Sequence, residues 1–241
     1  MLWVLIDSTV NQIFVTINSN IKNVDSSILY WVFVFAGLIM SIVVHEFAHA
    51  WSAHSLGDDT AKYEDRLNIN PLKHFDALGL GLILFTFIGY GKPVPVNPNN
   101  FDNPKKGMML VALAGPSSNL ILSIILGILF VAFKPFVVSG DLNSIGGIIN
   151  GIISTLVYAL PRIGAINIAL MVFNMLPFIP LDGSKIWGYI HWKVDEFLNT
   201  YVFPYSIVLI IVTILPILDG ISIFGILSSV FIIAYRLVFN L

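Results

Sequence analysis

Long apolar stretches separated by short polar ones dominate the pattern of this chain. The first strong run covers residues 28–56, with Ser26 and Ser27 before it as candidate N-caps and Gly57 after it as a stop signal. As a helix rising about 1.5 Å per residue, this run is long enough to cross a bilayer. Further apolar runs predict two more spans and a terminal helical pair turned by Asp219 and Gly220: residues 107–133, 163–179, 202–218 and 221–239.

The segments between these runs predict shorter or irregular elements. Residues 75–90 are apolar but shorter than the about 20 residues that a transmembrane helix needs, so we predict a re-entrant segment there. Residues 91–98 carry three prolines, which favours extended backbone. Residues 2–17 predict an amphipathic segment in the membrane interface or covering the bundle, and residues 183–197 a surface helix. The glycine-rich residues 140–151 fit either a loop or the start of a long helix.

Composition also indicates a membrane protein. Hydrophobic residues make up 57% of the 241 residues and charged residues 11%, and the mean hydropathy is +0.88. Soluble domains carry about 25% charged residues. We therefore predict an all-α polytopic membrane protein with five to six transmembrane helices and a short re-entrant or extended membrane-associated segment near residues 75–98. Residues 1–241 are expected to form one membrane-embedded domain.

The charges indicate an orientation and exclude one class of partner. The net charge of −2 provides no basic surface for nucleic acid. If residues 75–90 are re-entrant, Lys22, Lys134 and Arg162 fall on one side of the membrane. The other nine basic residues fall on the opposite side, which the positive-inside rule makes cytoplasmic. They are Lys62, Arg66, Lys73, Lys92, Lys105, Lys106, Lys185, Lys193 and Arg236.

A metal-binding pattern lies inside the first apolar run. His45, Glu46 and His49 form an HExxH sequence, in which two histidines one helical turn apart share a face and can bind one metal ion. Glu46 lies beside them and can polarise a metal-bound water. Ionisable residues inside a span are costly and mark functional sites. The alternative is that these three polar side chains only hold helices together.

Two histidines leave a catalytic zinc site incomplete, because such sites usually have three protein ligands. The chain has no cysteine, so the third ligand must be another His, Asp or Glu. Asp182 is the best candidate, because it follows a segment that Pro177 and Pro180 prevent from being helical. Irregular backbone at membrane depth is tolerated where it lines a site. The alternative for Asp182 is a helix cap or turn residue.

Two asparagines in the apolar runs have open roles. Asn119 follows Gly115 and Pro116, a combination that allows another backbone to approach closely. Its amide could bind a substrate carbonyl or the catalytic water, or it could hold helices together. The same two roles are open for Asn174, and the functional role is favoured because Asn174 precedes the segment that Pro177 and Pro180 prevent from being helical.

These motifs resemble the site-2 protease family of intramembrane zinc metalloproteases, in its compact prokaryotic branch without a PDZ domain. The resemblance covers about residues 30–190. It rests on the HExxH sequence, on Gly115-Pro116-Ser-Ser-Asn119, on the run from Asn174 to Asp182-Gly183, and on the proline-bearing residues 91–98. Position 184 is Ser, where many relatives have Gly.

The resemblance implies a peptidase domain with a catalytic core at about residues 28–190 and a C-terminal helical pair at about 200–240. One zinc ion per chain would be bound by His45, His49 and Asp182, and Glu46 would be the general base. The expected partners are transmembrane protein substrates and the lipid bilayer. The expected location is a prokaryotic cell membrane, with the active site toward the cytoplasm. The segment formed by Pro93, Val94, Pro95 and Val96 would offer an edge to an unwound substrate.

Two other functions fit the same residues. A metal transporter or channel would need a polar path continuing to the other face. Residues 28–40 of the first run offer almost no polar groups for one, so a one-sided cavity is favoured. A catalytically inactive relative that only binds membrane segments would not need Glu46. The substrate and the oligomeric state are not readable from the sequence.

Overall fold

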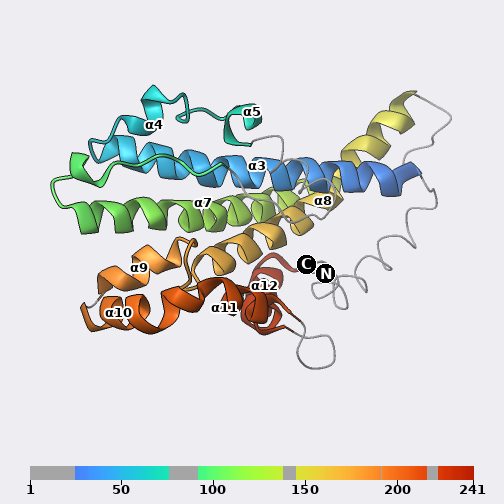
Figure 1. Ribbon diagram of the computed structural model, residues 1–241. Helices are drawn as coiled ribbons and strands as arrows, with labels where there is room; N and C mark the ends of the chain where they lie inside the picture. The colour runs from blue at the N-terminus through green and yellow to red at the C-terminus, as the bar shows by residue number, and fades with distance from the viewer. Residues whose placement is uncertain (1–24, 76–91, 138–144, 191, 216–221) are drawn as a thin grey trace. The chain divides into compact units, whose positions relative to one another are not determined.

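The computed structural model describes residues 25–75, 92–137, 145–190, 192–215 and 222–241. Every regular element among these residues is helical, as the apolar pattern predicts. The three longest helices are α3 (Asp25–Ser55), α7 (Pro104–Phe133) and α8 (Ile145–Asn174) (Figure 1). The interfacial segment predicted at 2–17, the re-entrant segment at 75–90 and the turn at Asp219-Gly220 lie wholly or almost wholly outside the described residues.

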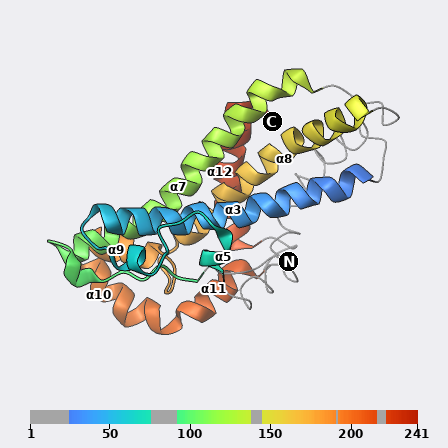
Figure 2. The same ribbon diagram turned by 90° about the horizontal axis from the view of Figure 1, so that it is seen from above.

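The remaining helices are shorter. They are α4 (Thr60–Tyr63), α5 (Pro71–His74), α9 (Gly183–Ile190), α10 (Trp192–Phe197), α11 (Ser206–Ile214) and α12 (Ile223–Phe239), with single turns at Pro98–Asn100, Lys134–Phe136, Leu198–Val202 and Phe203–Tyr205. The amphipathic surface helix predicted at residues 183–197 is two helices, α9 and α10, which pack against each other (Figure 1 and, from above, Figure 2). The prediction of a surface helix is wrong for most of α10, because residues from Lys193 onward belong to a helical stretch that is long and apolar enough to cross a membrane.

In the part of the chain that the structure describes, four helical stretches are long and apolar enough to cross a membrane, and α12 is a shorter apolar helix. They are Ile28–Ser55, Pro104–Phe136, Ile145–Asn174 and Lys193–Ile214. The prediction of an all-α polytopic membrane protein is therefore confirmed. The boundaries predicted for two spans were wrong. The stretch predicted to begin at residue 202 begins earlier, at Lys193. The apolar run at 163–179 suggested a helix there, whereas α8 begins at Ile145 and ends at Asn174, before Pro177.

The chain divides into two compact units, and the long helices contribute to both. Unit 1 comprises residues up to Leu38, Leu122–Ala169 and Val208–Leu241. Small residues let its helices approach closely: a Cβ at Gly37 would lie 2.6 Å from the side chain of Ile163. Glycines at such positions are typical of helix packing in membranes.

Unit 2 comprises Ile39–Ile121 and Leu170–Ile207, and it contains all the candidate site residues. A small apolar cluster of Ala53, Phe101 and Val111 joins α3, α7 and the loop between α5 and α7. Helix α3 ends in a turn centred on Gly57, whose φ of +102° lies in the left-handed region. There the N–H of Asp58 donates to the Ala53 carbonyl at 2.9 Å, and the N–H of Gly57 to His54. This is the Schellman arrangement, which favours glycine.

Candidate metal centre

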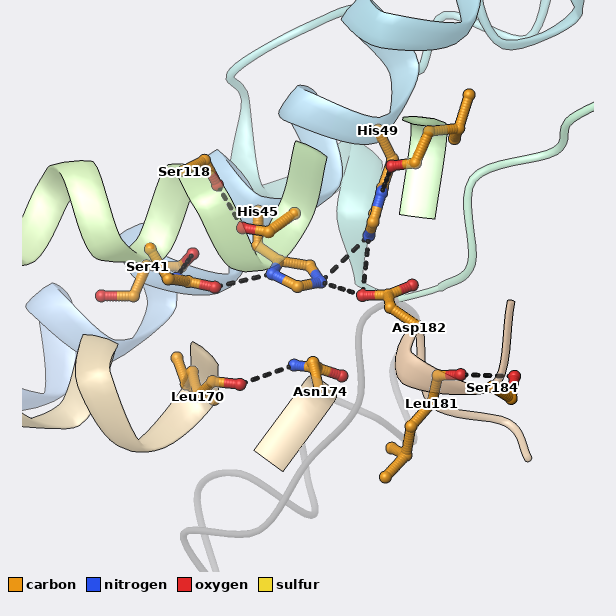
Figure 3. A network of polar contacts seen from close by, with 12 residues as sticks. Ser41, His45, His49, Ser118, Leu170, Asn174, Leu181, Asp182 and Ser184 are labelled. Carbon is orange, nitrogen blue, oxygen red and sulfur yellow. Dashed lines mark hydrogen bonds and ion pairs between the residues drawn. The ribbon is translucent and has the colours of Figure 1, made fainter. Parts of the chain in front are cut away.

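Helix α3 presents two imidazoles to one point. His45 and His49 are buried, with exposed fractions of 7% and 8%, and their Nε2 atoms lie 3.0 Å apart. The four-residue spacing puts both rings on the same face of α3. The carboxylate of Asp182 faces the same point, and Figure 3 shows the three side chains pointing toward one another.

The far nitrogen of each imidazole faces an oxygen acceptor. His45 Nδ1 lies 2.6 Å from the side-chain oxygen of Asn119, and His49 Nδ1 lies 2.7 Å from the backbone carbonyl of Val111. The amide of Asn119 is oriented because its nitrogen donates to the Ser41 carbonyl at 3.3 Å. Both Nδ1 atoms must therefore carry the proton and donate it. In the neutral ring this leaves each Nε2 with a free lone pair directed at Asp182.

The carboxylate of Asp182 completes a set of three electron-pair donors. Its Oδ2 lies 3.2 Å from His45 Nε2 and 3.3 Å from His49 Nε2. Within the described part of the chain, this buried oxygen accepts no hydrogen bond. Three lone-pair atoms this close to one another repel unless a positive charge lies between them, which is the arrangement of a metal-ligand set. Two ligands at a tetrahedral angle, each about 2.0–2.1 Å from one zinc ion, lie about 3.3 Å apart, so the three atoms fit zinc.

The turn that carries Asp182 is held by several contacts. Helix α8 ends at Asn174, and the two prolines that follow prevent it from continuing. The indole nitrogen of Trp187 donates to the Met175 carbonyl at 2.8 Å, and the N–H of Ile179 donates to the Ser206 hydroxyl at 3.1 Å. A Cβ at Gly183 would collide with the carbonyl oxygens of Met175 and Leu176, so only glycine fits next to Asp182.

Helix α7 approaches the two histidines at Gly115. A Cβ at this position would lie 2.5 Å from two ring atoms of His49 and 2.6 Å from Cε1 of His45. The missing side chain thus leaves the space that the two imidazoles occupy. The sequence marks Gly115 as a place of close approach, and the structure identifies the groups that approach it.

Glu46 is half-buried on α3, next to His45. Among the described residues its carboxylate forms no hydrogen bond or ion pair, so it is available to accept a proton. At 100° per residue, Glu46 lies about 60° around the helix from His49, on the side of the metal-facing rings.

The structure places the other predicted site residues differently. The side-chain nitrogen of Asn174 donates to the Leu170 carbonyl one turn back at 3.0 Å, and no hydrogen bond among the described residues joins it to the three candidate ligands (Figure 3). Residues 93–96 lie in the same unit as non-helical backbone, and among the described residues no hydrogen bond or ion pair joins them to the metal centre. His54 pairs with Asp59 and His74 with the Asn68 carbonyl, so neither belongs to the cluster.

Sequence reasoning missed four groups at this site: Ser41, Val111, Trp187 and Ser206. The first two contribute only a backbone carbonyl, which residue type does not reveal. Trp187 and Ser206 resemble ordinary interfacial and helix-capping residues in the sequence, so no signal marked them.

A zinc metalloprotease family accounts for this fold and this donor set. The chain belongs to peptidase family M50, whose family model matches residues 33–229, and the resemblance to site-2 proteases is thereby confirmed. It is 39% identical over 149 residues to "Putative zinc metalloprotease YwhC" of Bacillus subtilis (strain 168). The alignment covers 62% of this chain and 64% of that relative, slightly under two thirds.

A second relative is more distant. "Putative zinc metalloprotease Rip2" of Mycolicibacterium smegmatis is 30% identical over 159 residues, which cover 64% of this chain and 55% of that protein. No solved structure matches the chain.

Proposed function

We propose that this protein is an intramembrane zinc metalloprotease that hydrolyses peptide bonds within or near the transmembrane segments of other proteins. The observation that carries the proposal is the meeting of His45 Nε2, His49 Nε2 and Asp182 Oδ2, all within 4.8 Å of one another. Two of these ligands lie on a helix apolar enough to span the membrane.

We propose one zinc ion per chain, held by His45, His49 and Asp182. Such an ion supplies Lewis acidity and lowers the pKa of a bound water toward 7. The side-chain oxygen of Asn119 and the backbone carbonyl of Val111 orient the two imidazoles by accepting hydrogen bonds from their Nδ1–H groups. Because both ends of the Asn119 amide are already bonded, we assign it to orienting His45 rather than to binding substrate.

The carboxylate of Glu46 would move the proton. It takes a proton from the attacking water as the carbonyl carbon of the scissile bond is attacked. It then delivers that proton to the leaving amine, which prevents the bond from re-forming. Its position beside His45 and its lack of a partner among the described residues support this assignment.

The substrate side is assigned to two elements. A helical substrate hides its peptide groups, so it must unwind before cleavage, and the segment Pro93–Val96 would pair with the unwound strand. The side-chain oxygen of Asn174 has no partner among the described residues and is free to receive a substrate N–H. The nine basic residues grouped by the predicted topology support a cytoplasmic active site, and the bacterial relatives support a prokaryotic cell membrane.

The test is cleavage of single-span substrates by the purified protein in proteoliposomes. The variant Glu46→Gln should keep its zinc and lose at least about 100-fold in turnover. Glu64→Gln, which neutralises an exposed glutamate outside the site, is the matched control and should cleave normally. Normal cleavage by Glu46→Gln would show that Glu46 is not the base.

The same vesicles separate the protease from the transporter and from the inactive relative. A transporter would move zinc across the bilayer and leave substrates intact, whereas the protease cleaves them without zinc flux. An inactive relative would bind a single-span segment without cutting it, and its wild-type and Glu46→Gln forms would behave alike.

A further inference from the structure

Two buried charged side chains of unit 2 are not used by the metal centre. Asp58 has an exposed fraction of 0% and Arg66 of 3%, and both lie beyond the end of the candidate span at Ser55. Burying a charge is costly unless hydrogen bonds satisfy it. The hydrogen-bond partners of Asp58 and Arg66 show which parts of the chain each residue joins.

Asp58 receives four hydrogen bonds. Its Oδ1 accepts from the Thr60 N–H at 3.1 Å, the Thr60 hydroxyl at 2.5 Å and the Asn100 side-chain nitrogen at 2.6 Å. Its Oδ2 accepts from the backbone N–H of Asn97 at 2.8 Å. Burial alone would raise the pKa of Asp58, but these bonds lower it below the usual range, so the group is an anion. Asp58 thus joins the end of α3 to the loop that begins at Asn97.

Arg66 binds the chain at Lys92, on the other side of residues 93–96 from Asn97. Its Nη1 donates to the Lys73 carbonyl at 2.7 Å and its Nη2 donates to the Lys92 carbonyl. The N–H of Lys92 in turn donates to the His74 carbonyl at 2.6 Å. Among the described residues Arg66 has no carboxylate partner, so its hydrogen bonds go to backbone carbonyls.

Between these two anchors lies the segment Pro93–Val96. Proline restricts the residue before it to extended conformations, which applies to Lys92 and Val94. Among the described residues, the backbone N–H and C=O groups of Val94 and Val96 form no hydrogen bond. The side chain of Val96 packs on the cluster of Ala53, Phe101 and Val111, which adds a third attachment.

The two edges of this segment are unequal. In an extended chain, residues 94 and 96 direct their N–H and C=O groups to one edge and residues 93 and 95 to the other. Pro93 and Pro95 have no N–H, so the second edge offers no donors. The edge of Val94 and Val96 keeps both donors and acceptors and is the one that a substrate strand can pair with.

We infer that Asp58 and Arg66 are positioning residues that hold Pro93–Val96 as a ready-formed, one-sided edge for an unwound substrate segment. This inference rests on the proposed protease function. An edge held at both ends loses less conformational freedom when a substrate binds than a free loop would. Loss of an anchor should therefore weaken substrate binding and leave the metal centre intact.

The direct measurement is a distance between two spin labels. The chain has no cysteine, so labels can be placed by Val94→Cys and by Ser55→Cys, an exposed position at the end of α3. Asp58→Asn should broaden the distance distribution, because an amide nitrogen cannot accept from the Asn97 N–H. Asp102→Asn removes one exposed carboxylate nearby and should leave the distribution unchanged.

The functional measurement uses the unlabelled proteins. Asp58→Asn should raise KM for a single-span substrate about tenfold or more, the loss expected when hydrogen bonds to a charged group are removed. Its kcat should stay within about twofold of wild type, and its zinc content should not change. Arg66→Lys, which keeps the charge but not the two-pronged contact, should act in the same direction.

The possible outcomes distinguish the positioning role of Asp58 from the proposed protease function. If Asp58→Asn does not fold, Asn100→Ala replaces it, because this variant removes one donor and keeps the buried carboxylate. Unchanged distances and KM in the folded variants would overturn the inference, as would a fall in kcat with KM unaltered. Absence of cleavage by the wild type would overturn the proposed function, and the distances would still decide whether Asp58 holds the segment.

Discussion

His45 Nδ1 lies 2.6 Å from the side-chain oxygen of Asn119, which is 74 residues further along the chain. This contact determines which nitrogen of His45 faces Asp182 with a free lone pair. The carbonyl of Val111 acts in the same way on His49, 62 residues away. One face of α7 therefore prepares both imidazoles of α3 to bind a cation.

Replacing Asn119 should weaken zinc binding without removing a ligand. For Asn119→Leu we expect zinc affinity to fall about 10–100-fold, the usual effect of removing a group that orients a metal-bound histidine. Competition with a chelator measures this affinity. Asn119→Asp keeps an acceptor for Nδ1 and should retain most of it. Ser118→Ala, whose hydroxyl donates only to the Gly115 carbonyl, is the control. Equal affinity of Asn119→Leu and wild type would contradict the orienting role.

Removing the carboxylate of Asp182 should empty the site. Asp182→Ala leaves two histidines, which are too few protein ligands for a catalytic zinc site. We expect zinc measured by elemental analysis of the purified protein to fall well below that of wild type. Asp102→Ala, at an exposed position, should not change it. Unchanged zinc in Asp182→Ala would remove this residue from the ligand set.

A methyl group at Gly115 should disturb the histidines from the opposite helix. In Gly115→Ala the added Cβ meets His49 at 2.5 Å and His45 at 2.6 Å, so α7 or the rings must move. Overpacking of this kind costs about 1–3 kcal/mol, and the displaced rings should also bind zinc more weakly. Gly146→Ala is the matched control, because a Cβ there meets nothing within 4 Å. Thermal unfolding and zinc content check both variants. A Gly115→Ala protein as stable and zinc-rich as Gly146→Ala would be inconsistent with this packing.

The spacing of the two histidines within one helix was predictable from the sequence, and the contacts between distant segments were not. Helix geometry alone places His45 and His49 on one face. Asp182 could be selected because it follows prolines that interrupt an apolar run, and irregular backbone at membrane depth is tolerated where it lines a site. The acceptors from Ser41 and Val111 are backbone carbonyls, which every residue possesses. No residue pattern could therefore identify them.

Helix lengths show a similar limit. The glycines near residue 146 suggested a loop or the start of a long helix, and α8 begins at Ile145. Glycine is tolerated inside membrane helices because neighbouring helices and the apolar surroundings stabilise them. At the other end the apolar run continues to residue 179, whereas α8 ends at Asn174, before Pro177, because a proline cannot continue the helix. Apolar composition alone therefore located neither end of this helix.

The anchoring of Asp58 should be visible as a dependence of stability on pH. The pKa of Asp58 is lower in the folded protein than the value of about 3.9 of a free aspartate, so the folded state binds its proton less readily. The stabilisation is therefore complete above the unfolded-state pKa and is lost as the pH falls through the lower folded pKa. We expect the difference in Tm between wild type and Asp58→Asn to be constant from about pH 8 to pH 5 and to shrink below about pH 4. Chelator in every sample removes the contribution of metal release, and Asp102→Asn should show no such change. A difference that persists undiminished at the lowest pH would show that neutral Asp58 holds the loop equally well, and that its charge is not what stabilises the contact.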